Sequence, residues 1–149
     1  MNIFHALLVS HQTQRELVER FLVSFHDPLD RERIFAELKA ELAAHETAEE
    51  RCFYVPLFEH DETVDESRHA IAEHHEMDEM VESLEKMNPG TEDWRACARK
   101  LCEKIGHHLE EEETKFFPAA GQVLTDEQKQ QLALDYEAEF TTLRVKAEA

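Results

Sequence analysis

The sequence repeats itself at an offset of 63 residues, and this repeat limits the possible folds more than any other feature of the chain. The offset places His45 on His108 and Glu49 on Glu112, so both halves contain a His-x-x-x-Glu motif. It also matches residues around the motifs: His11 with His74, Leu38 with Leu101, Leu42 with Ile105, Glu50 with Glu113, Phe53 with Phe116 and Tyr54 with Phe117. Self-similarity at a fixed offset indicates a structure assembled from two related units.

Apolar residues recur at helical spacing through most of the chain, which is typical of amphipathic helices. This pattern predicts five helices, over residues 3 to about 26, 30 to 57, 64 to 87, 91 to 117 and from 126 onward. Asp30 is the expected N-cap of the second helix, and Pro118 and Gly121 are expected to end the fourth. Capping boxes at 63–66 and 125–128 predict the starts of the third and fifth helices.

Four helices joined by short turns predict an all-α fold, an up-down-up-down four-helix bundle with an additional C-terminal helix. We expect residues 1–120 to form the bundle, and residues 121–149 to form a helix that packs on the bundle or extends from it. Six polar side chains fall on inward helix faces, where the pattern otherwise places apolar residues: His11, His45, Glu49, His74, His108 and Glu112. In a bundle, these six groups converge on one region of the core.

Inward histidines and glutamates have two explanations. A single histidine on an apolar stripe is usually a hydrogen-bonded core residue rather than a ligand. Two unpaired carboxylates buried beside four histidines, however, would be costly, and a bound cation would offset that cost. Imidazole and carboxylate donors without cysteine suit iron or manganese, and one carboxylate from each half could bridge two ions. We therefore expect a metal site, and a structural bundle without metal is the alternative.

The residues of the repeat resemble those of the hemerythrin-like family, the hemerythrin HHE cation-binding domains, from residue 1 to about 120. This resemblance implies a four-helix bundle that holds a non-haem di-iron centre, two iron ions joined by an oxo or hydroxo bridge. It implies terminal ligands at His11, His45, His74 and His108 and bridging carboxylates at Glu49 and Glu112.

The third helix departs from the oxygen-carrying members of that family, which place two histidines four residues apart there. In this chain Asp78 follows His74 at that spacing. Some relatives carry His-Glu-x-x-Glu on the second helix, as this chain does from His45, so Glu46 is an additional candidate metal ligand.

The other histidines near the motifs are expected to have lesser roles. His5 and His69 lie near the lines of candidate ligands and are reserve candidates. His75 and His107 point about 100° away from their neighbouring ligands, so we expect them to be solvated or to contact ligands from outside. The run from Glu110 to Glu113 is expected to be a solvated face with one inward residue.

The chain is strongly acidic, with 34 acidic and 16 basic residues and a formal net charge of -18. This charge opposes binding to nucleic acid and to anionic membranes. The odd number of cysteines, Cys52, Cys97 and Cys102, indicates reduced thiols rather than a disulfide framework. No apolar run approaches the length of a membrane span, and no signal-peptide pattern is evident, so we expect a cytoplasmic protein.

Two classes of function fit such a site. One is a di-iron protein that binds or reacts with dioxygen or peroxide, which leaves open a weak peroxidase, catalase or oxidase activity. The other is an iron or redox sensor, or an iron-handling protein, without turnover. In either case the expected partners are small molecules, and the sequence does not indicate a protein partner.

Overall fold

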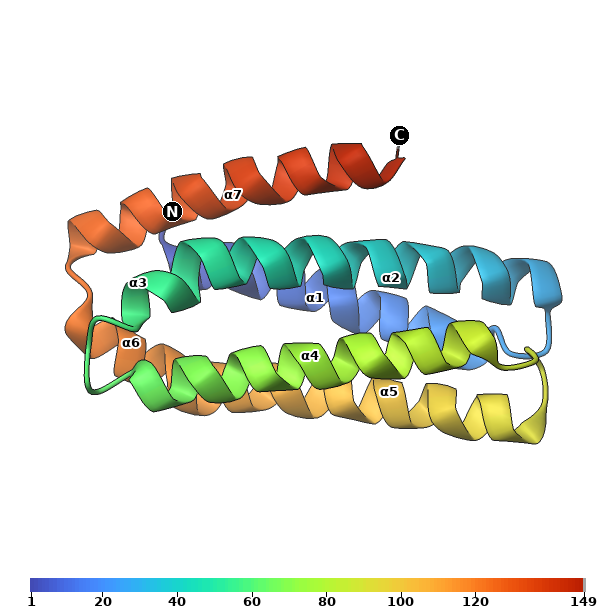
Figure 1. The fold of residues 1–149 in the computed structure, drawn as a ribbon. Helices are drawn as coiled ribbons and strands as arrows, with labels where there is room; N and C mark the ends of the chain where they lie inside the picture. Colours follow the sequence, from blue (N-terminus) through green and yellow to red (C-terminus); the bar gives the residue numbers. More distant parts are fainter. Residues whose placement is uncertain (149) are drawn as a thin grey trace.

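A computed structural model describes residues 1–148 as helices joined by short turns, with no strand in that range (Figure 1). Ala149, the last residue of the expected C-terminal segment, lies outside the described residues. The bundle consists of α1 (Ile3–Val23), α2 (Pro28–Glu49), α4 (Val64–Lys86) and α5 (Glu92–Glu111). These helices run alternately in opposite directions, and α7 (Asp126–Glu148) forms the additional C-terminal helix (Figure 1). The predicted all-α bundle is therefore confirmed.

The start of α2 differs from the prediction by three residues. Asp27, not Asp30, is the N-cap, and its side chain accepts a hydrogen bond from the Asp30 amide. Pro28 occupies the first turn, where its fixed φ suits a helix and no amide proton is needed. The helix therefore begins before the position that the capping pattern indicates.

The other predicted helix starts agree in position but not always in chemistry. Thr125 and Gln128 exchange hydrogen bonds at the start of α7, which confirms a capping box. Thr91 accepts a hydrogen bond from the Trp94 amide at the start of α5. The capping box predicted at Thr63 is wrong, because the Thr63 hydroxyl donates a hydrogen bond to the Leu57 carbonyl and does not cap α4.

A π-helical segment lies at the end of each His-x-x-x-Glu motif. The segment η1 (Glu50–Tyr54) starts directly after Glu49 in the first half, and η2 (Glu112–Phe116) starts at Glu112 itself in the second. Short helices continue the chain beyond them, α3 (Val55–Leu57) and α6 (Phe117–Val123). The prediction that Pro118 ends the helix is wrong, as is the prediction for Gly121. Pro118 lies in the first turn of the new segment, where a proline is tolerated, so the helix continues through it.

The apolar core forms two clusters with a polar layer between them. One cluster contains Phe53, Leu57 and Phe116, and the other contains Leu38 and Leu101. The inward histidines and glutamates lie between the two clusters along each bundle helix. The polar layer is therefore held between two packed apolar regions.

The C-terminal helix α7 packs against α1 and α2 (Figure 1). Its Ala133 and Tyr136 are buried in the first apolar cluster. The Arg144 guanidinium lies 3.7 Å from a carboxylate oxygen of Glu41 on α2. None of the helices over residues 1–148 is long and apolar enough to cross a membrane.

Candidate metal centre

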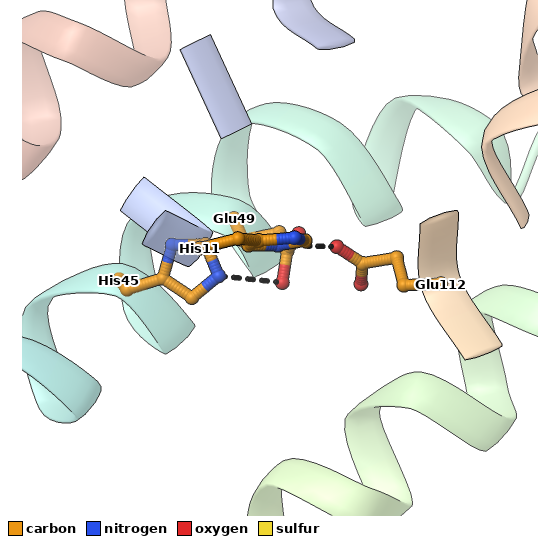
Figure 2. A group of neighbouring side chains, drawn as sticks. All are labelled: His11, His45, Glu49 and Glu112. Atoms are coloured by element: carbon orange, nitrogen blue, oxygen red, sulfur yellow. Dashed lines mark ion pairs between the residues drawn. The ribbon is translucent and has the colours of Figure 1, made fainter. Parts of the chain in front are cut away.

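Four of the predicted site residues lie together at the centre of the bundle (Figure 2). His11 comes from α1, His45 and Glu49 come from α2, and Glu112 comes from η2. One potential ligand atom from each of these residues lies within 4.8 Å of those of the others. Figure 2 shows the two ion pairs of the group: His11 Nε2 is 3.2 Å from Glu112 Oε1, and His45 Nε2 is 3.3 Å from Glu49 Oε1.

The remaining two predicted histidines form a second group that shares Glu49 with the first. His74 Nε2 lies 3.3 Å from Glu49 Oε1, the same oxygen that His45 faces. His108 Nε2 lies 3.7 Å from Glu112 Oε2. All six predicted residues are therefore brought together, and the two carboxylates lie between the two pairs of histidines.

The atoms that point into this centre have no hydrogen-bond partner. Within the described part of the chain, the Nε2 atoms of all four histidines are buried and make no hydrogen bond, although each lies 3.2–3.7 Å from a carboxylate oxygen. Glu49 Oε2 and Glu112 Oε1 are also buried without a hydrogen bond. Buried polar atoms in native proteins nearly always form hydrogen bonds, so six such atoms around one region need an explanation. Nitrogen and carboxylate oxygen donors arranged in this way fit one or two transition-metal ions.

The other ring nitrogen of each histidine is held from outside the centre. Three of the partners are carboxylates and the fourth is a phenol: Glu113 at 2.6 Å from His11 Nδ1, Glu50 at 2.8 Å from His74 Nδ1, Glu73 at 2.9 Å from His108 Nδ1 and Tyr136 at 2.7 Å from His45 Nδ1. Such outer partners are characteristic of metal-binding histidines, because they fix the ring and leave Nε2 free to bind.

Glu113 contradicts one prediction. It was expected on a solvated face, but its side chain is only 22% exposed, and it accepts hydrogen bonds from His11 and Arg15. These hydrogen bonds outweigh burial and hold the pKa of Glu113 at about 2. The repeat contained the signal for this contact, because it pairs Glu113 with Glu50, and both glutamates contact the inward histidine of the other half.

Tyr54 is a polar contact that the sequence did not indicate. Its hydroxyl lies within hydrogen-bonding distance of both carboxylates, 2.6 Å from Glu49 Oε1 and closer still to Glu112 Oε2. Burial and the two carboxylates raise the pKa of Tyr54 well above its usual range, so the phenol keeps its proton. The hydroxyl can donate to only one carboxylate at a time. The π turn of η1 places Tyr54 five residues after Glu49 on the same inward side.

The two central carboxylates differ in their affinity for protons. Burial, together with the negative charge of Glu49, raises the pKa of Glu112 to about 8. Burial also opposes ionisation of Glu49, but His45 and His74 outweigh it and hold the pKa of Glu49 well below its usual range. The two close carboxyl groups thus favour a state in which Glu49 is ionised and Glu112 holds a proton. A bound cation can replace that proton and compensate both carboxylates.

The remaining candidates lie outside the two groups. Glu46 is buried on α2 but is not brought to the centre, and burial raises its pKa to about 10, so it is neutral there. His5 and His69 are exposed. His69 forms a third group with Glu111 and the buried Glu73, the outer partner of His108, and its Nε2 is 2.8 Å from Glu111 Oε1.

A pocket of about 270 Å³ reaches the centre from the surface between α4 on one side and α5 and η2 on the other. Its inner lining includes His108 and Glu112, and its outer lining includes His69, Glu111 and Lys115. This volume is enough for several water-sized molecules, so a small molecule can approach the inward groups without unfolding the bundle.

A four-helix bundle with histidines and carboxylates converging in its core defines a class of cation-binding helical proteins. The sequence model of the hemerythrin HHE cation binding domain family matches residues 2–120, and the chain belongs to this family.

The chain is also similar to part of a longer protein. A DNA nickase from Nostoc sp. (strain PCC 7120 / SAG 25.82 / UTEX 2576) is 25% identical to this chain over 138 residues. The aligned part covers 93% of this chain but only 39% of the nickase, so the chain spans about two fifths of that relative's length. No solved structure matches the chain.

Proposed function

We propose that this chain binds two iron ions and that the ion pair binds or reacts with dioxygen or peroxide. The observation that carries this proposal is the set of four buried Nε2 atoms that make no hydrogen bond and surround two central carboxylates. His11 and His45 would hold one ion and His74 and His108 the other, with Glu49 and Glu112 joining the two. Mixed imidazole and carboxylate donors without sulfur suit iron. A bound iron pair supplies the exchange of electrons with the small oxidant.

The surrounding residues prepare the histidines for this role. Glu113, Glu50 and Glu73 would each accept a hydrogen bond from the Nδ1–H of their histidine, so that Nε2 could give its lone pair to an ion at the centre. Tyr54 holds a proton at its hydroxyl oxygen against the two carboxylates and so limits the negative charge that they present. The apolar clusters pack on either side of the centre, and the pocket beside His108 admits small molecules.

The alternative is an iron or redox sensor without turnover, and one contact favours it. The Tyr136 hydroxyl of α7 contacts His45 at the centre, so loss or oxidation of the metal would alter a contact of the C-terminal helix. A partner protein could then recognise the altered position of α7. Turnover of peroxide at steady state distinguishes the two functions, because a sensor consumes no more than a stoichiometric amount.

Metal content tests the main proposal. Protein purified in air should contain about two iron atoms per chain and should show the near-ultraviolet charge-transfer absorption of an oxo- or hydroxo-bridged pair. Colourless protein with one zinc ion per chain would contradict the proposal. We also propose small oxidants rather than nucleic acid or membranes as partners, because the formal net charge of -18 repels polyanions. The cytoplasmic location stays a prediction.

A further inference from the structure

The four inward histidines are not supported equally. Carboxylates hold the outer nitrogens of His11, His74 and His108, whereas a phenol holds that of His45. The repeat makes this difference informative, because it matches His45 with His108. Two positions that are equivalent in the sequence therefore have chemically different partners.

The difference begins at a single position of the repeat. His108 is held by Glu73, and the repeat places Ser10 at the position of Glu73. The short side chain of Ser10 does not bond His45 itself but contacts the Tyr136 hydroxyl at 2.6 Å. Ser10 and Tyr136 together thus occupy the place that one glutamate fills in the other half.

Tyr136 comes from α7, which lies outside the repeat and outside the residues that match the family model. It is 2% exposed, and its ring lies 5.9 Å from the ring of His45 and stacks on Phe140. By contrast, Glu50 and Glu73, the outer partners of His74 and His108, both belong to the bundle. Among the described residues, His45 is therefore the only central histidine that α7 supports.

The acceptor at His45 is also weaker. When Nε2 binds an ion, Nδ1 carries the proton and donates it to the Tyr136 oxygen, and the Tyr136 hydroxyl then donates to Ser10 Oγ. A neutral phenol accepts a weaker hydrogen bond than a carboxylate does. The His45 ring consequently gains less basicity from its partner than the other three rings gain from theirs.

We propose that Tyr136 is the positioning residue of His45, and that it makes the ion held by His11 and His45 the weaker-bound and α7-dependent ion of the pair. This inference rests on the proposed binding of two ions. Both histidines of the second group have carboxylate partners, so the ion held by His74 and His108 binds more tightly and without help from α7. By linkage, docking of α7 and occupancy of the first position strengthen each other.

Stepwise metal binding tests this inference. Metal-free protein is titrated with iron(II) without oxygen and followed by calorimetry, with wild type expected to bind two ions of unequal affinity. Tyr136→Phe keeps the ring and removes the hydroxyl, and should weaken the weaker ion by about 10- to 100-fold while leaving the tighter ion unchanged. Ser10→Ala should shift the same ion in the same direction by a smaller factor, because the Tyr136 ring stays in place.

The matched control changes the outer partner of a histidine that holds the other ion. Glu50→Gln gives His74 a neutral acceptor and should weaken the tighter ion instead. If wild type fails to bind two ions, the proposed function fails. If wild type binds two but Tyr136→Phe weakens both equally, or neither, the role of Tyr136 is wrong. If Tyr136→Phe destabilises the metal-free protein, its effect on metal binding is ambiguous and Ser10→Ala is used instead. Selective weakening of the weaker ion then supports the proposal, and equal weakening of both ions, or of neither, contradicts it.

Discussion

Each inward histidine uses its two ring nitrogens for different tasks, and this division explains why neighbouring histidines are not equivalent. His108 is buried, with Nδ1 bonded to Glu73 and Nε2 directed at the centre. His107, one residue earlier, has a side chain that is 67% exposed and pairs with Glu111. A rotation of about 100° per residue thus separates a candidate ligand from a surface group.

The substitution His108→Ala removes one candidate ligand and leaves Glu73 without its partner. We expect it to lower the iron content from about two ions per chain to about one, and to weaken binding of the remaining ion by at least 10-fold. The control His107→Ala should leave both quantities unchanged, because His107 contacts only surface groups. Metal analysis of the two purified variants checks this, and an exchange of their effects would show that the helix phase is wrong by one residue.

At the level of elements, the two π-helical segments determine which residues after the motifs face inward. In a regular α-helix, Phe53 would follow Glu49 on the same face, but the wider turn of η1 brings Tyr54 to the carboxylates. In the second half the matching residue is Phe117, which packs in the apolar cluster. The same backbone device therefore presents a hydroxyl in one half and an apolar ring in the other.

Tyr54→Phe tests the contribution of that hydroxyl. The variant keeps the ring but removes the buried hydroxyl that can donate to Glu49 or Glu112, so the metal-free protein should lose about 1–3 kcal/mol of unfolding free energy. The loss should be smaller with iron bound, because cations then compensate the carboxylates. Urea unfolding of both forms measures this. Equal losses with and without iron would mean that the ring, and not the carboxylate contact, is responsible.

Much of this arrangement could be predicted because it follows from local pattern. Thr91 and Thr125 marked helix starts correctly, and the inward phase of His11 and His74 followed from the apolar stripe and the repeat. The π segments could not be predicted, since residues such as Phe53 fit an α-helix equally well. The contact of Tyr136 depends on how α7 folds back over α1 and α2, which no local pattern determines.

For the whole molecule, the central fact is that buried carboxylates and unpaired nitrogens interrupt an otherwise apolar core. The two apolar clusters stabilise the bundle, whereas the layer between them is costly without compensating charge. The overall stability should therefore depend on metal far more than that of a bundle with a continuous apolar core.

Removal of metal should lower the melting temperature, and added iron(II) should restore it. A ligand that binds only the folded state at 100 times its Kd adds about 2.7 kcal/mol of stability, so the melting temperature should rise steadily with iron concentration. Magnesium is the control, because it prefers oxygen ligands and water and gains little from four imidazoles. A metal-free protein as stable as the loaded one would support the structural alternative of a bundle without metal.

The crossed contacts between the halves also impose an order on biosynthesis. His11 is held by Glu113 and His74 by Glu50, so each half supplies the support for the inward histidine of the other. A ribosome makes the chain from its N-terminus, and a nascent chain that ends before Glu113 lacks part of the centre. Tyr136 emerges later still. An iron ion held at the proposed centre would therefore enter an assembled bundle rather than a growing chain, and the pocket beside His108 and Glu112 offers it a route.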